Sequence, residues 1–209
     1  FGARNHAADL VLGEVVDICQ GVADWSLYSI DPATVDQACS VLAAWDKRHL
    51  TDSVGPHIFH ELWRRIDEAP TLWAVPFDPA DPVNTPRQLN TGDADLLALI
   101  KQSLADAVAA LEGIPMDRPW GEIQFDEKNG VRHGMHGGSG DMMFSVISSD
   151  LVPGVGYSNI RHGNSYMQAV TWDQTDCPDA YTILSYSQST DPASDNYADS
   201  TELYSNGAW

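Results

Sequence analysis

A histidine and a serine lie three residues apart in RHGNSYMQAVTWD, residues 161–173. Ser165 could act as a hydrolase nucleophile with His162 as its base, because a serine needs an adjacent base to become nucleophilic. The nucleophile elbow G-x-S-x-G places glycines around a sharp turn from a strand into a helix. Here Met167 stands where the second glycine belongs, and a strand pattern follows. On an extended chain His162 and Ser165 also point to opposite faces. The sequence therefore favours a strand entered through a glycine kink.

The segment HGGSG, residues 136–140, has the composition of an oxyanion-binding loop. In lipases such a loop follows a strand and donates backbone N–H groups to the negatively charged oxygen. No elbow serine accompanies it in this sequence. Because glycine-rich segments also simply connect strands, we interpret residues 136–140 as a connection without a chemical role.

Two groups of side chains have the chemistry of metal ligands. His57 and His60 lie three residues apart on an expected helix, beside Glu61, and could bind a metal if a third ligand joined them. Their spacing differs from H-E-x-x-H, so a surface or interface histidine pair is the simpler interpretation. A second group could bind calcium but lacks the EF-hand pattern, and a solvated acidic loop explains it. Its members are Asp191, Asp195, Asp199 and Glu202. We therefore expect no metal and no cofactor.

Four helices are expected in the first half of the chain. Apolar residues recur at helical spacing over residues 6–20, 31–47 and 55–68, and from Asp93 to near residue 113. Asp31 and Asp93 have the position and chemistry of N-caps. The proline-rich segment 69–91 should be extended, because proline biases the residue before it away from helix.

Strands are expected after residue 118. Residues 120–148 have the pattern of strand, turn, glycine loop and strand, and 157–173 and 179–189 predict two more strands. These strands show little alternation, which is typical of strands covered on both faces. The helices all precede them and cannot supply both covers, so we expect further layers from outside this chain. The fold class is α+β, with a mainly helical portion 1–117, a strand portion 118–209 and a polar loop at 187–202.

The composition excludes some classes of partner. The chain has 209 residues, 43% apolar and 20% charged, with a formal net charge of −19. Affinity for nucleic acid or anionic membrane comes from Lys and Arg clusters, so this surface should repel both. No apolar run approaches the ~20 residues of a membrane helix. A neutral or small-molecule ligand fits this composition.

The pairing of the cysteines would indicate whether the protein is exported from the cell. Cys19 and Cys39 lie on two consecutive expected helices joined by a short loop, which can bring their Cα atoms within disulfide reach. A disulfide would indicate an exported protein, whereas two buried free thiols are the alternative. Cys177 is the third cysteine, and an odd count leaves at least one unpaired within the chain.

Four stretches together resemble a known family: FGARNHAADLVLGEVVDIC, PVNTPRQLNT, LVPGVGYSNIRHGNSYMQAV and ILSYSQSTDPASDNYADSTELYS. They are similar, in this order, to the C-terminal part of the β-subunit of the penicillin acylase family, in its aculeacin A acylase and acyl-homoserine lactone acylase branch. The resemblance implies an N-terminal nucleophile hydrolase with an αββα core, made from an exported precursor that cleaves itself. The N-terminal serine of the β-subunit then attacks an amide carbonyl, with its own α-amine as base.

The family's catalytic residues have no counterpart in this chain. It begins with Phe1 and offers no position for the serine or for the oxyanion-hole asparagine. The resemblance therefore implies that residues 1–209 are one fragment of a β-subunit, either processed or trimmed at its ends and inactive by itself. Its partners would be the rest of the β-subunit and the α-subunit, in the periplasm or outside the cell.

The resemblance also implies a class of substrate. Acyl-homoserine lactones, lipopeptides and penicillins are the expected amides. His162, Asn164 and Ser165 are then expected to support the fold near the active site. The alternative is a non-catalytic exported module that kept the fold for binding or assembly.

Overall fold

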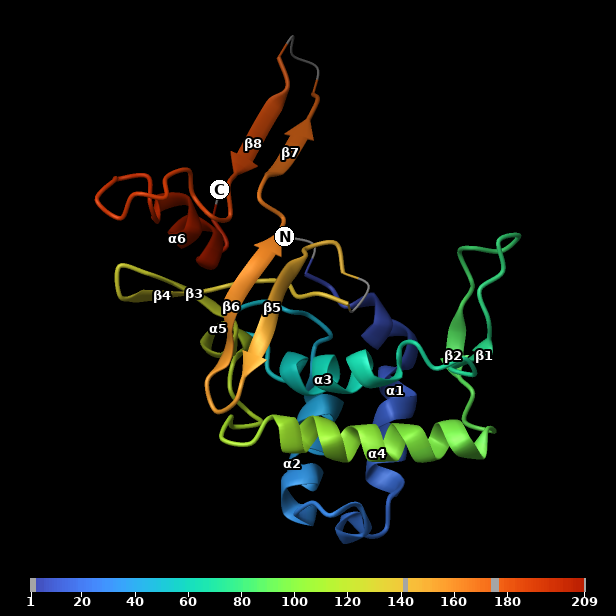
Figure 1. The fold of residues 1–209 in the computed structure, drawn as a ribbon. Helices are drawn as coiled ribbons and strands as arrows, with labels where there is room; N and C mark the ends of the chain where they lie inside the picture. The colour runs from blue at the N-terminus through green and yellow to red at the C-terminus, as the bar shows by residue number, and fades with distance from the viewer. Residues whose placement is uncertain (1–2, 141–142, 174–176, 209) are drawn as a thin grey trace.

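The first half of the chain forms a helical unit (Figure 1). The computed structural model describes residues 3–140, 143–173 and 177–208. The helices of this unit are α1 (His6–Gly21), the 3-10 helix η1 (Trp25–Tyr28), α2 (Pro32–Ala44), α3 (Pro56–Ile66) and α4 (Ala94–Ala110). The two predicted N-caps are confirmed, since Asp31 accepts from the Thr34 amide and Asp93 from those of Asp95 and Leu96. Each cap satisfies N–H groups that the first helical turn leaves without partners.

A disulfide joins α1 to α2. Cys19 and Cys39 are bonded with their Cα atoms 5.7 Å apart, and both side chains are buried. Around this bond the helices bury one continuous apolar core, and such burial is the dominant favourable term in folding. Its largest fully buried members include Trp25, Leu42, Ile58, Phe59, Leu62, Ile66, Ile100, Trp120 and Tyr157.

The proline-rich connection forms a hairpin. Strands β1 (Trp73–Val75) and β2 (Arg87–Leu89) pair antiparallel. The segment 69–91, expected to be extended, therefore contains two short paired strands. The hairpin stands away from the helices in Figure 1. Leu89 at its base is buried, and the Leu89 amide donates to a carboxylate oxygen of Glu14 on α1 over 2.9 Å. The base of the hairpin is therefore anchored to the helical unit.

The described residues of the second half form three more antiparallel strand pairs and two short helices. These elements are α5 (Trp120–Ile123), β3 (Phe125–Lys128), β4 (Val131–Gly134), β5 (Ile147–Val152), β6 (Gly156–Gly163), β7 (Met167–Thr171), β8 (Asp179–Ile183) and α6 (Asp199–Ser205). Pairing is β3 with β4, β5 with β6 and β7 with β8. The predicted turn at Asn129-Gly130 is confirmed, because both residues have positive φ between β3 and β4. Helices followed by small antiparallel sheets make this an α+β fold, as expected.

Three details differ from the expected strand pattern. Residues 120–123 are helical rather than extended, because Trp120 is drawn into the helical core and its indole donates to the Gly137 carbonyl. The expected strand 157–173 is interrupted at 164–166. The C-terminal end of the polar loop 187–202 becomes α6, where buried Tyr204 anchors the helix.

Strands β7 and β8 are largely exposed within this chain. Met167 and Ile183 are their only buried residues, and these pack in a second cluster with Met135, Ile147 and Tyr204. The predicted cover by layers from outside this chain stays a prediction, since these strands are described without any such layer. The hairpin extends away from the helical unit in Figure 1, so the described residues leave most of its surface open.

Candidate functional site

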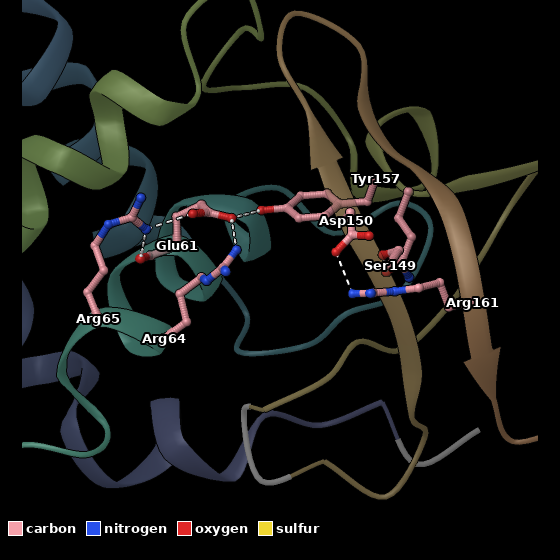
Figure 2. Close-up of polar contacts among 8 residues, drawn as sticks. Glu61, Arg64, Arg65, Ser149, Asp150, Tyr157 and Arg161 are labelled. Atoms are coloured by element: carbon pink, nitrogen blue, oxygen red, sulfur yellow. Dashed lines mark hydrogen bonds and ion pairs between the residues drawn. The ribbon is translucent and has the colours of Figure 1, made fainter.

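A buried carboxylate joins the helical unit to the β5–β6 hairpin (Figure 2). Glu61 on α3 is 1% exposed, and the hydroxyl of Tyr157 on β6 donates to its Oε1 over 2.6 Å. Arg65 Nη1 lies 2.6 Å from Oε2, and Arg64 Nη1 lies 3.4 Å from Oε1. Both carboxylate oxygens therefore have donors, as a buried charge requires.

The electrostatics of Glu61 favour a structural role. Burial raises the pKa of Glu61, but the hydrogen bonds from Tyr157 and Arg65 and the charges nearby outweigh it, so its pKa is lowered. The carboxylate is therefore ionised at neutral pH and has no proton to donate as a general acid. The contacts of Glu61 with Tyr157 and Arg65 connect α3 to β6, and this group is called the clamp below.

The two histidines of α3 do not form a metal site. His57 is fully buried, and neither ring nitrogen has a hydrogen-bond partner. Burial lowers the pKa of His57 to about 3, with a smaller contribution from His49. His60 packs edge-on against the Tyr157 ring at 5.5 Å, while Glu61 is engaged by arginine. Over residues 3–140, 143–173 and 177–208 no group of three potential ligands could hold a metal ion.

The glycine loop 136–140 is held by internal hydrogen bonds. The Gly137 amide donates to the His49 carbonyl over 2.7 Å, and the Gly138 amide donates to the Ser145 carbonyl over 3.2 Å. The Gly137 carbonyl accepts from Trp120 Nε1 at 2.9 Å and Gln124 Nε2 at 2.8 Å. These amides are not available to an oxyanion, so the structure supports a connection rather than a catalytic loop.

His136 lies between the helical unit and α6. Its Nδ1 accepts from the Thr51 amide at 3.1 Å, so Nε2 carries the proton and donates to the Ser205 carbonyl at 3.2 Å. Burial lowers the pKa of His136, which favours the neutral form of the ring. The Tyr204 hydroxyl donates to the His136 carbonyl at 2.8 Å. Sequence reasoning missed this network because its members are far apart in the chain.

The segment 161–173 contains no nucleophile–base pair. His162 is on β6, Ser165 follows in the break before β7, and both are exposed. No hydrogen bond joins these two side chains in the described part of the chain. Asn164 has the structural role here, since its Nδ2 donates to the Phe144 carbonyl at 3.0 Å and its backbone amide to the Val146 carbonyl at 2.8 Å. Ser185 adds a hydrogen bond to the Asn164 carbonyl.

The C-terminal acidic loop is fixed by hydrogen bonds from a lysine side chain. Lys128 Nζ donates to the carbonyls of Tyr186 at 2.7 Å and Tyr197 at 2.9 Å. Asp191 accepts from the Ala193 amide at 2.9 Å, which is a local turn. The four acidic residues therefore belong to an ordered loop and helix, and the described residues offer no calcium cage.

The described residues thus form a scaffold whose polar groups serve the fold. None of the helices in this part combines the length and apolarity that a bilayer-spanning segment requires. The architecture is an α+β fold in which the β7–β8 strand pair is largely exposed.

Comparison with known proteins identifies the family. Residues 2–209 match the penicillin amidase family model. The chain is 38% identical over its full length to aculeacin-A acylase of Actinoplanes utahensis, covering 26% of that protein. It is 33% identical over 97% of its length to the acyl-homoserine lactone acylase PvdQ of Pseudomonas fluorescens, covering 25% of it. The chain spans about a quarter of these relatives and belongs to the penicillin amidase family.

Proposed function

We propose that this chain is part of an acylase that hydrolyses the amide bond of an N-acylated substrate. The nucleophile is an N-terminal serine located outside residues 1–209, and the reaction passes through an acyl-enzyme. Water then releases a carboxylic acid and an amine. The match of essentially the whole chain to a family with acylase relatives carries this proposal.

The exposed strands support the proposal that this chain is one part of a larger acylase. Aromatic residues on β7–β8 and next to it in the chain are open to solvent, with Trp172 75%, Tyr166 55% and Tyr181 55% exposed. Burying large aromatic side chains is strongly favourable, and contiguous exposed apolar surface marks an interaction site. We propose that the rest of the acylase covers this hairpin and completes an αββα core. The remaining β-subunit and the α-subunit are its partners, in the periplasm or outside the cell.

His162, Asn164 and Ser165 are proposed to support the fold near the active site. Asn164 makes the contacts for such a role, since it connects the end of β6 to residues 144–146. The buried disulfide between Cys19 and Cys39 suits export, because disulfides persist in oxidising compartments.

The proposed substrates of the acylase are amides that carry an apolar acyl group. The named relatives act on aculeacin A and on acyl-homoserine lactones, so a lipopeptide and a long-chain acyl-homoserine lactone are the first to test, followed by an aliphatic penicillin. A non-catalytic module is the second candidate, favoured by the absence of a nucleophile–base pair among the described residues.

Amide hydrolysis by the full-length protein tests the proposal. The protein is incubated with each of the three substrates, and the released amine and carboxylic acid are quantified. Equimolar release of both, together with a subunit beginning with serine in the intact-mass spectrum, supports the acylase. A folded, processed protein that turns over none of the three substrates would favour the non-catalytic module.

A further inference from the structure

The β1–β2 hairpin carries a proline-rich arm, residues 76–86, whose shape is fixed without help from the helical core. The Asp78 amide donates to Thr85 Oγ1 at 2.8 Å, and Thr85 Oγ1 donates to the Asp81 carbonyl at 2.7 Å. Asn84 Nδ2 donates to Asp81 Oδ1 at 2.7 Å. These bonds cross the arm and define one conformation for its tip.

The base of the arm is anchored on both strands. Leu72 and Leu89 are 1% and 2% exposed, and the Asn90 amide donates to the Leu72 carbonyl at 2.9 Å. The ring of Trp73 lies 6.1 Å from that of Trp63 on α3. The arm is therefore held at a fixed place relative to the helices, and Figure 1 shows it standing apart from them.

The surface of the arm is apolar and acidic. Val83 is 90% exposed and Phe77 is 58% exposed. Residues 76–86 include four prolines and two aspartates, Asp78 and Asp81, and no lysine or arginine. Proline restricts the free chain, so a proline-rich segment loses little conformational entropy when it binds. These are the properties of a preformed ligand for a protein surface.

We infer that the arm docks into the part of the same acylase polypeptide that lies outside residues 1–209. This inference rests on the proposed function. The chain covers only 26% of aculeacin-A acylase, so most of the molecule that would receive the arm lies beyond this chain. The receiving surface has an apolar pocket for Phe77 and Val83, bordered by lysine or arginine that complements Asp78 and Asp81. The arm thus holds this chain against the rest of the acylase, at a place distinct from the β7–β8 hairpin.

Cysteine accessibility in the full-length protein tests this inference. V83C is treated with a maleimide under native conditions and in urea, and the label is located by peptide mass spectrometry, which separates it from Cys177. L27C is the matched control, since Leu27 on η1 is 80% exposed. We expect native V83C to react at least tenfold more slowly than in urea, and L27C to react at similar rates in both.

A second variant tests the energetic role of the contact. F77S/V83S should lower the urea midpoint for unfolding of the full-length protein, while L27S leaves it unchanged. Equal native and unfolded labelling of V83C overturns the inference, as does protection that disappears on dilution, because that assigns the arm to a second copy. Turnover is measured on the same samples. Active enzyme with a reactive V83C overturns only the docking, and inactive protein with a protected V83C overturns only the acylase function.

Discussion

The Tyr157 hydroxyl donates a 2.6 Å hydrogen bond to Oε1 of Glu61, a residue 96 positions earlier in the chain. The contact connects β6 to α3 (Figure 2), and both side chains are buried. Because Glu61 also binds Arg65 at 2.6 Å, the β5–β6 hairpin is fixed against a charged pair on the helical unit.

Removing that hydroxyl should destabilise the protein. Tyr157→Phe leaves a buried carboxylate with one donor fewer, which costs about 1–3 kcal/mol. Urea unfolding of the full-length protein measures the change. Arg64→Gln is the control, because the Arg64 side chain is 57% exposed and lies 3.4 Å from Oε1, and a solvent-screened ion pair of this kind contributes roughly 0–1 kcal/mol. An unchanged unfolding midpoint for Tyr157→Phe would show that the clamp contributes nothing.

The buried His57 should make stability fall on mild acidification. Burial holds its folded pKa at about 3, below the ordinary value of 6.5. Between these values the unfolded chain binds more protons, so the stability contributed by neutral His57 is complete above pH 6.5 and decreases as the pH falls toward 3. The slope is about 1.4 kcal/mol per pH unit well below 6.5.

A substitution isolates this effect. His57→Leu should flatten the dependence of the urea midpoint on pH between 7 and 5, while the exposed His162→Gln leaves the slope as in the parent protein. This range stays above the ordinary pKa of Glu61, 4.5, so the clamp does not titrate in it. An identical slope for His57→Leu and the parent would contradict the assignment.

Two glycines of one loop should respond differently to alanine. A Cβ at Gly137, with φ of +87°, would lie 2.4 Å from the Ser145 carbonyl oxygen, whereas one at Gly140, with φ of +81°, meets nothing within 4 Å. Gly140→Ala should cost about 1–2 kcal/mol for its backbone conformation alone. Gly137→Ala adds a backbone clash and should cost several kcal/mol more, as thermal unfolding would show. Equal melting temperatures would disprove the close approach.

Local signals in the sequence predicted much of the helical unit. Asp31 and Asp93 cap helices as expected, because capping depends only on the next two or three residues. The Asn129-Gly130 turn is equally local. The polar contacts of Glu61 could not be predicted this way, since the position of its partner Tyr157 is set by the packing of β6 on α3. No spacing rule connects two such distant positions.

Helices α5 and α6 also could not be predicted from local sequence patterns. The segments containing them resemble a strand and a polar loop, but Trp120 and Tyr204 are each buried by distant parts of the chain. For residues 161–173, the missing elbow glycine argued against a nucleophile, and the structure places Ser165 in an exposed break between two strands. The supporting role of Asn164 depends on residues 144–146, about twenty positions earlier.

Covalent trapping tests most directly that the nucleophile lies outside this chain. The full-length protein is treated with a long-chain alkyl fluorophosphonate, which bonds to activated serines, and the adduct is located by peptide mass spectrometry. We predict one adduct on a serine outside residues 1–209 and the same extent of labelling in Ser165→Ala. An adduct on Ser165 that disappears in Ser165→Ala, together with loss of amide hydrolysis, would contradict the account.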